Sequence, residues 1–142
     1  MRLIRGPGNQ RGTSTLEFVV VLPFLLLIFL ASLELSRAWL TDNIMVNAAR
    51  EGARWGVVTS PTFDNVAAEA RMKDVLDAAN LTTEPPSVTC TAVSPNPTPA
   101  DPCPRDSEVL ASVTMNFETV VPLFLPMLNP LVLQETVRMR RE

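Results

Sequence analysis

An unbroken apolar run near the N-terminus, FVVVLPFLLLIFLASL at residues 18–33, constrains this chain more than any other feature. With two further residues on each side it makes a twenty-residue segment. As a helix at ~1.5 Å per residue this segment is about 30 Å long, which is enough to cross a bilayer. Pro23 lies inside the run, where a membrane helix tolerates a kink better than a soluble helix does. The sequence therefore predicts a transmembrane helix over residues 13–35.

The charges on either side of this segment predict its orientation. Residues 1–12 form a basic leader with three arginines and no acidic residue, so the positive-inside rule places the leader in the cytoplasm and residues after about 36 outside. A cleaved secretory signal peptide is the alternative, but its apolar stretch is usually ~7–15 residues long and ends in small residues. Here Glu34 and Arg37 crowd the one suitable small pair, Ser36 and Ala38, which favours a retained anchor.

Composition argues against several classes of function. Three of the twelve basic residues lie in the leader, so nine face fifteen acidic residues in the rest of the chain, without a basic cluster, and no nucleic-acid partner is expected. The chain has no histidine, which removes the commonest general base and the commonest metal ligand. It has no phosphate-binding loop and no activated nucleophile. We therefore expect no enzymatic activity, no catalytic residue, no bound metal and no cofactor.

One carboxylate, Glu17, stands at the entrance of the apolar run. One interpretation is a solvated residue at headgroup depth. The other is that the anionic form persists because a cation meets it in the bilayer. Cleavage after Gly12 would supply that cation, because the new amine of Thr13 would lie about one helical turn from Glu17, in the same chain or in a neighbouring subunit.

The order of a basic leader, Gly12, Thr13, Glu17, Phe18 and an apolar helix resembles a type IV prepilin signal. More narrowly, GTSTLEFVVVLPFLLLIFLASLELSRAW followed by NAAREGARWG resembles the TadE-like minor pseudopilins of tight-adherence (Flp-type) pilus systems, over residues 11–58. The resemblance implies that a prepilin peptidase cuts between Gly12 and Thr13. It also implies that Glu17 and Phe18 serve in membrane assembly.

The same resemblance implies a function and a location. The chain would be a minor pilin-like structural and assembly subunit, acting in pilus biogenesis and adhesion beside other pilin or pseudopilin subunits and the assembly machinery. It would lie in the bacterial inner membrane as a single-pass protein, or in the cell-surface pilus. An alternative from a different class is a membrane-tethered extracytoplasmic binding domain that is not part of a fibre.

Residues 36–58 predict an amphipathic continuation of the membrane helix. Ala48, Gly52 and Gly56 recur every four residues and form a smooth strip that another helix or a sheet can approach closely. Each glycine costs ~1 kcal/mol relative to alanine inside a helix, so we expect close packing there, either on this chain's own domain or on another subunit. On the polar side, Glu51 can pair with Arg54. The expected apolar side consists of Leu35, Ala38, Trp39, Met45, Val46, Ala49, Ala53, Gly56 and Val57.

Residues 59–142 predict a small extracytoplasmic α+β domain. A second helix is expected to start with Ser60 as its cap and Pro61 in its first turn, and to end at Asn80. Segments rich in Val and Thr then favour strands. These are residues 87–93, residues 108–117 and a final antiparallel strand within residues 131–142. The predicted fold class is α+β, with a long N-terminal helix and a second helix packed on a small antiparallel sheet.

A proline-rich loop, residues 94–107, separates the first two predicted strands. Cys90 and Cys103, the only cysteines, flank most of it, and outside the cytoplasm a disulfide is the favoured interpretation. Such a bridge would stabilise the domain by ~3 kcal/mol. A metal held by two thiols would lack further ligands.

A second apolar stretch, VVPLFLPMLNPLVL at residues 120–133, contains a proline at every fourth residue, which excludes a membrane helix. It is expected either to cover the sheet or to dip into the outer face of the membrane.

Overall fold

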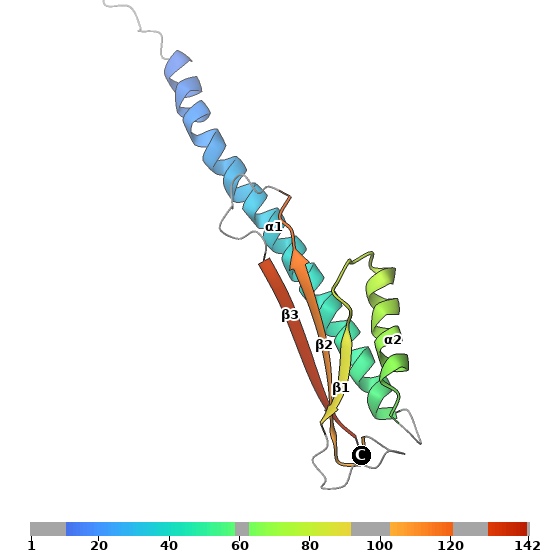
Figure 1. Cartoon of the computed structure of the whole chain (residues 1–142). Coiled ribbons are helices and arrows are strands. Elements are labelled where there is room, and N and C mark those ends of the chain that lie inside the picture. The colour runs from blue at the N-terminus through green and yellow to red at the C-terminus, as the bar shows by residue number, and fades with distance from the viewer. Residues whose placement is uncertain (1–10, 59–62, 92–102, 121–130, 142) are drawn as a thin grey trace, which may run out of the picture. The chain divides into compact units, whose positions relative to one another are not determined.

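The computed structural model describes residues 11–58, 63–91, 103–120 and 131–141, with side chains from Thr15 onward. Its elements are α1 (Arg11–Val58), α2 (Asn65–Ala78), β1 (Ser87–Thr91), β2 (Glu108–Phe117) and β3 (Leu131–Arg140) (Figure 1). The predicted α+β class is confirmed: a long N-terminal helix, a second helix and a three-stranded antiparallel sheet. The chain divides into two compact units, residues 1–36 and 37–142, and each is described by itself.

In the first unit, most of α1 is exposed, and Glu34 near its end is buried. All side chains from Thr15 to Phe29 are exposed, and Pro23 lies within the helix. The hydroxyl groups of Ser32 and Ser36 donate to the carbonyl oxygens four residues earlier, each at 2.8 Å, so neither needs an external acceptor. This part of α1 is long and apolar enough to span a membrane.

In the second unit, the sheet has the order β1-β2-β3, and the described helices cover one of its faces. The central strand, β2, buries Val109, Ala111 and Val113, and its alternate residues lie on the other face. The register places Cys90 of β1 and Met139 of β3 on either side of Val109. Because successive side chains alternate, the odd-numbered residues of β3 share the covered face with these β2 residues.

The core lies where the C-terminal part of α1 and α2 meet this covered face. Its buried apolar side chains come from α1, α2, the sheet and the segment before β2. They are Met45, Ala48, Ala49, Ala53, Ala68, Met72, Leu76, Val88, Cys103, Val109, Ala111 and Val113. Many are alanines, because α1 packs closely enough that larger side chains would not fit. On the polar side of α1, the Arg54 guanidinium and the Glu51 carboxylate form an ion pair with an N–O distance of 3.9 Å.

Two residues predicted on the apolar side of α1 are not packed: Leu35 is 70% exposed and Trp39 is 71% exposed. At about 100° per residue, Trp39 lies roughly 120° away from the buried direction that Met45 and Gly52 define. The indole is therefore left on a flank of the helix.

The ends of α2 show why it starts later than predicted and ends as predicted. Asp64 is the N-cap, and its carboxylate accepts from the Ala67 amide at 3.1 Å, so the prediction of Ser60 as the cap is wrong. At the other end, the Asn80 amide donates to Asp77 at 2.9 Å and the Leu81 amide to Leu76 at 3.0 Å. Asn80 has a positive φ of 55°, which asparagine tolerates, and so closes the helix.

Parts of several sequence predictions lie outside the described residues. These include residues 1–10 of the basic leader, residues 94–102 of the proline-rich loop and residues 121–130 of the second apolar stretch. The final predicted strand is present as β3, and the first is described as far as Thr91.

Candidate functional site

The predicted processing and assembly residues all lie at the start of α1. Gly12 and Thr13 belong to its first turn, and Glu17 and Phe18 follow one turn later. The Phe18 ring is 58% exposed, and Glu17 is exposed beside it. This stretch thus presents one carboxylate within an otherwise apolar lateral surface, which suits contact with lipid or with other apolar helices.

The small-residue strip lies in the core of the second unit. Ala48 is fully buried, and a Cβ atom on Gly52 would collide with the side chain of Met72 on α2. A Cβ atom on Gly56 would lie 2.9 Å from Val109 Cγ1 of β2. The strip therefore brings α2 and β2 of the same chain against α1. Among the described residues, its close contacts lie within the chain.

Cys90 and Cys103 form a disulfide, with Cα atoms 5.7 Å apart. The C-terminal residues hold the segment around Cys103 in place. The Arg141 guanidinium donates to the Cys103 carbonyl oxygen, the Arg141 amide donates to the Ser107 carbonyl at 2.9 Å, and Arg140 pairs with Asp106 at 3.2 Å. The bridge thus connects β1 to the turn before β2 and to the end of β3, so all three strands are fastened at one end.

Two carboxyl groups meet where α1 packs beside β3. Asp42 of α1 hydrogen-bonds with Glu135 of β3, and both residues are half-buried. Partial burial, this hydrogen bond and the negative charge of Asp42 raise the pKa of Glu135 above its ordinary value of 4.5. No ion pair found among the described residues includes either group. The pair is an acidic site in an otherwise apolar layer.

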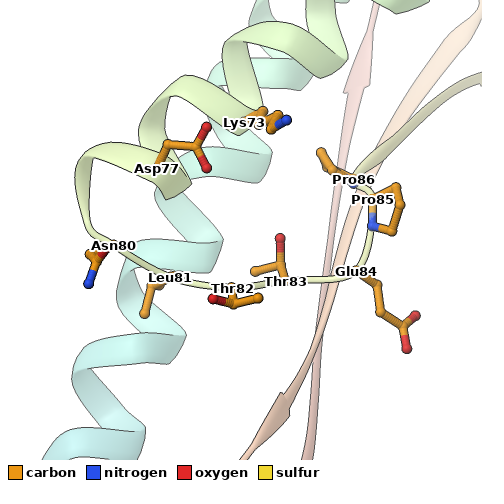
Figure 2. Close-up of a pocket in the computed structure, with 9 residues that line it drawn as sticks. All are labelled: Lys73, Asp77, Asn80, Leu81, Thr82, Thr83, Glu84, Pro85 and Pro86. Atoms are coloured by element: carbon orange, nitrogen blue, oxygen red, sulfur yellow. The ribbon is translucent and has the colours of Figure 1, made fainter.

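A hollow of ≈ 510 Å³ lies between α2 and the segment that leads to β1 (Figure 2). Lys73 and Asp77 of α2 line one side, and residues 80–86 line the other. Figure 2 shows the side chains of Asn80 and Glu84 pointing away from Lys73 and Asp77, so the polar groups do not converge on one point. A catalytic site needs such convergence. In the described ranges, no group of three or more His, Cys, Asp or Glu side chains is placed to hold a metal ion.

Comparison with known families adds the decisive observation for the N-terminal segment. Residues 12–54 match the family described as TadE-like protein. This segment is TadE-like. Neither the curated proteins nor the solved structures yield a match to the chain. Over these residues the chain is similar to TadE-like proteins.

The TadE-like segment covers under a third of the 142 residues, but it contains most of the predicted site. Gly12, Thr13, Glu17 and Phe18 lie within it, as do Ala48 and Gly52 of the strip. It ends two residues before Gly56, and α2 and the whole sheet lie outside it. It also contains the apolar helix that is long enough to span a membrane.

Sequence reasoning missed the Asp42–Glu135 pair, although a signal was present. Leu133, Val137 and Met139 form an apolar row of β3 on the covered face, and Glu135 is the one charged member of that row. A carboxylate in an apolar row is either unfavourable or functional. The sequence does not reveal that Asp42 lies beside Glu135, because the two residues are far apart along the chain.

Proposed function

We propose that this chain is a minor pilin-like structural and assembly subunit of a Tad (Flp-type) pilus, anchored by α1 and acting in pilus biogenesis and adhesion. The observation that carries the proposal is the position of the TadE-like match, which begins at Gly12 and includes Thr13, Glu17 and the apolar part of α1. The proposed partners are the membrane, a prepilin peptidase, other pilin or pseudopilin subunits and the pilus assembly machinery.

The proposed mechanism starts with cleavage between Gly12 and Thr13 by the prepilin peptidase. Hydrolysis of this peptide bond leaves the carboxylate on the leader and a protonated amine on Thr13. Glu17, about one helical turn away, then pairs with that amine or with the amine of a neighbouring subunit. In a low-dielectric membrane such a pairing is strong, because an unpaired carboxylate there is costly. The exposed apolar surface of α1 would meanwhile pack against the helices of other subunits.

The charge distribution and the disulfide support an orientation with the N-terminus in the cytoplasm. The leader carries three arginines and no acidic residue, which favours its retention inside. The Cys90–Cys103 bridge suits an oxidising compartment, which is where residues 37–142 would then lie. The proposed location is the inner membrane, with this unit on the outer side.

Mass spectrometry of the protein purified from its host tests the cleavage. We expect the mature chain to begin at Thr13, and we expect the full-length chain to accumulate when the prepilin peptidase gene is deleted. A chain that begins at Met1 in both strains would contradict the proposed processing and would favour the membrane-tethered binding domain. A chain that begins near Trp39 would indicate removal of the anchor and would contradict the proposal entirely.

A Glu17→Gln variant tests the role of the carboxylate. Glutamine keeps the size of the side chain but removes its charge, so we expect the anchor to insert normally and incorporation into surface filaments, or support of their assembly, to fall at least about tenfold. Membrane fractionation and counts of surface filaments by electron microscopy measure these two outcomes. Glu108→Gln, an exposed carboxylate on β2, is the matched control and should leave both unchanged. Normal filaments from Glu17→Gln would contradict the proposed pairing.

A further inference from the structure

The outer edge of β3 is a long strand edge without a neighbour among the described residues. The sheet order β1-β2-β3 pairs β3 with β2 alone, over ten residues from Leu131 to Arg140 (Figure 1). The other outer strand, β1, has five residues and packs beside α2. Unpaired backbone groups along an edge strand are a template for pairing with another strand.

The covered face of β3 is incompletely covered. On β2, the residues of this layer are buried, with Val109 and Ala111 fully so and Val113 1% exposed. On β3, every residue of the same layer is only half-buried: Leu131, Leu133, Glu135, Val137 and Met139. The layer of α1 and α2 therefore shields the centre of the sheet and stops short of its edge. One more strand beside β3 would bury this row.

One flank of α1 extends the same surface. Trp39, Asp42 and Val46 follow the i, i+3, i+7 spacing of a single helix face, and Asp42 contacts Glu135. Trp39 is 71% exposed and Val46 is half-buried. The flank thus offers apolar contacts on both sides of the Asp42–Glu135 pair.

The acidic pair decides what kind of strand fits this edge. An inward-pointing charge on an edge strand opposes pairing, because an apolar strand laid over it would bury an uncompensated carboxylate. A strand that places a lysine or arginine opposite Glu135 would instead neutralise the pair and form charge-assisted hydrogen bonds. Among the described residues, no ion pair joins a lysine or arginine to Asp42 or Glu135, which agrees with the raised pKa of Glu135.

A second copy of β3 that pairs in the antiparallel direction does not supply that cation. Residues that face each other across paired strands point to the same side of the sheet. Glu135 belongs to the odd-numbered, covered row, whereas Arg138 and Arg140 belong to the alternate, exposed row. The chain's own undescribed internal segments, residues 59–62, 92–102 and 121–130, contain no lysine or arginine.

We propose that the outer edge of β3, together with the α1 flank of Trp39, Asp42 and Val46, is the docking site for an extended strand of another protein that carries a lysine or arginine between apolar residues of its inward-facing row. The strand would pair with the β3 backbone, its apolar side chains would cover Leu133, Val137 and the α1 flank, and its cation would bind Asp42 and Glu135. This inference does not depend on cleavage at Gly12 or on incorporation into a fibre.

Binding of labelled synthetic peptides to the detergent-solubilised full chain tests the proposal. The probe is a peptide of about ten residues, the length of a strand, in which threonine and valine alternate and lysine replaces the central valine. Two matched peptides carry glutamine or glutamate in place of this lysine. Fluorescence anisotropy should give at least about tenfold tighter binding for the lysine peptide than for either other peptide, as expected for a charge-assisted contact. Equal binding of all three peptides, or binding of none, would overturn the proposal.

Variants of the protein and of the peptide separate the acidic pair from the strand edge. Glu135→Gln and Asp42→Asn should each remove most of the preference for lysine, while Asp77→Asn on the exposed side of α2 should keep it. Two further lysine peptides carry N-methyl groups on alternate amides, one on each edge of the strand. One should fail to bind and the other should bind as before. A lysine preference that survives Glu135→Gln, or binding of both methylated peptides, would contradict docking by strand addition.

Circular dichroism and the intact disulfide mass verify that each variant is folded. Cross-linking of a Thr136→Cys variant detects the competing occupant, a second copy of the chain. Self-cross-linking at this exposed position of β3 would overturn the proposed partner, and its absence at concentrations that saturate the lysine peptide would support it.

Discussion

At the scale of single residues, the chemistry of the folded unit is concentrated in the contact between Asp42 and Glu135. Because partial burial and the neighbouring carboxyl group raise the pKa of Glu135 in the folded state, the folded chain holds this proton more tightly than the unfolded chain does. Protonated Glu135 therefore contributes to the free energy of unfolding. This contribution is fully present below the ordinary pKa of 4.5 and is lost as pH rises through the folded-state pKa. The ionised form of Glu135 therefore stabilises the fold less than the protonated form does.

This dependence of stability on pH leads to a prediction for Glu135→Gln. The variant should be more stable than the natural chain at pH 7, and its advantage should shrink as pH falls towards about 4.5, where the natural side chain is increasingly protonated. Chemical unfolding of both proteins across this pH range, followed by tryptophan fluorescence, measures the difference. Asp77→Asn, on an exposed helix position, is the control and should show no comparable advantage. A variant less stable than the natural chain at pH 7 would contradict the assignment.

At the scale of elements, the packing of α1 depends on the absence of side chains at two positions. Gly52 lets Met72 of α2 lie directly on the helix backbone, and Gly56 does the same for Val109 of β2. Alanine would improve helix propensity by ~1 kcal/mol at either position. Overpacking typically costs about 1–3 kcal/mol, so the steric term outweighs the gain in propensity.

A double-mutant cycle between Gly52 and Met72 tests this balance. Gly52→Ala alone should destabilise the protein by about 1 kcal/mol, because Met72 is displaced. In a Met72→Ala background the same change should be neutral or stabilising, because the new methyl group enters the space that methionine has left. Arg50→Ala, on the exposed side of α1, should change stability by less than about 0.5 kcal/mol. Additive effects in the cycle would mean that the two residues do not share this contact.

At the scale of the whole molecule, a thin three-stranded sheet is held by one covalent link. The Cys90–Cys103 disulfide closes a loop with a sequence separation of 13, and the segment around Cys103 is in turn bound by Arg141 at the end of the described chain. In the chain-entropy view, a bridge over a loop of this size stabilises the fold by about 3 kcal/mol. A small domain has little core to compensate for its loss.

Reduction should therefore lower the free energy of unfolding by about 3 kcal/mol, measured by urea denaturation of the full chain in detergent with and without a thiol reductant. A Cys90→Ala/Cys103→Ala variant should start from the lower stability and should not respond to the reductant. If the natural chain keeps its midpoint after complete reduction, verified by mass, then the bridge does not stabilise the fold as proposed.

The sequence alone determined the features that depend on neighbours along the chain. The run of residues 18–33 is apolar enough to indicate a spanning helix by itself, and Asn80 ends α2 through a local change of backbone conformation. The Val- and Thr-rich segments predicted the strands because strand propensity also depends on residues close together along the chain. The predicted N-cap of α2, Ser60, is wrong. Ser60 and Asp64 are both residue types that favour this position, and only the folded structure shows that Asp64 occupies it.

Only the tertiary structure decided which surfaces meet. Periodicity gave α1 an apolar side, but the position of α2 and the sheet determined that Met45 is buried and Trp39 exposed. The register of β3 brought Glu135 to Asp42, a contact across most of the chain that no local pattern encodes. Helices, turns and membrane spans arise from short-range hydrogen bonding and hydrophobicity, which the order of residues specifies directly. Contacts between distant elements arise from competition among many possible packings, and only the folded chain selects one.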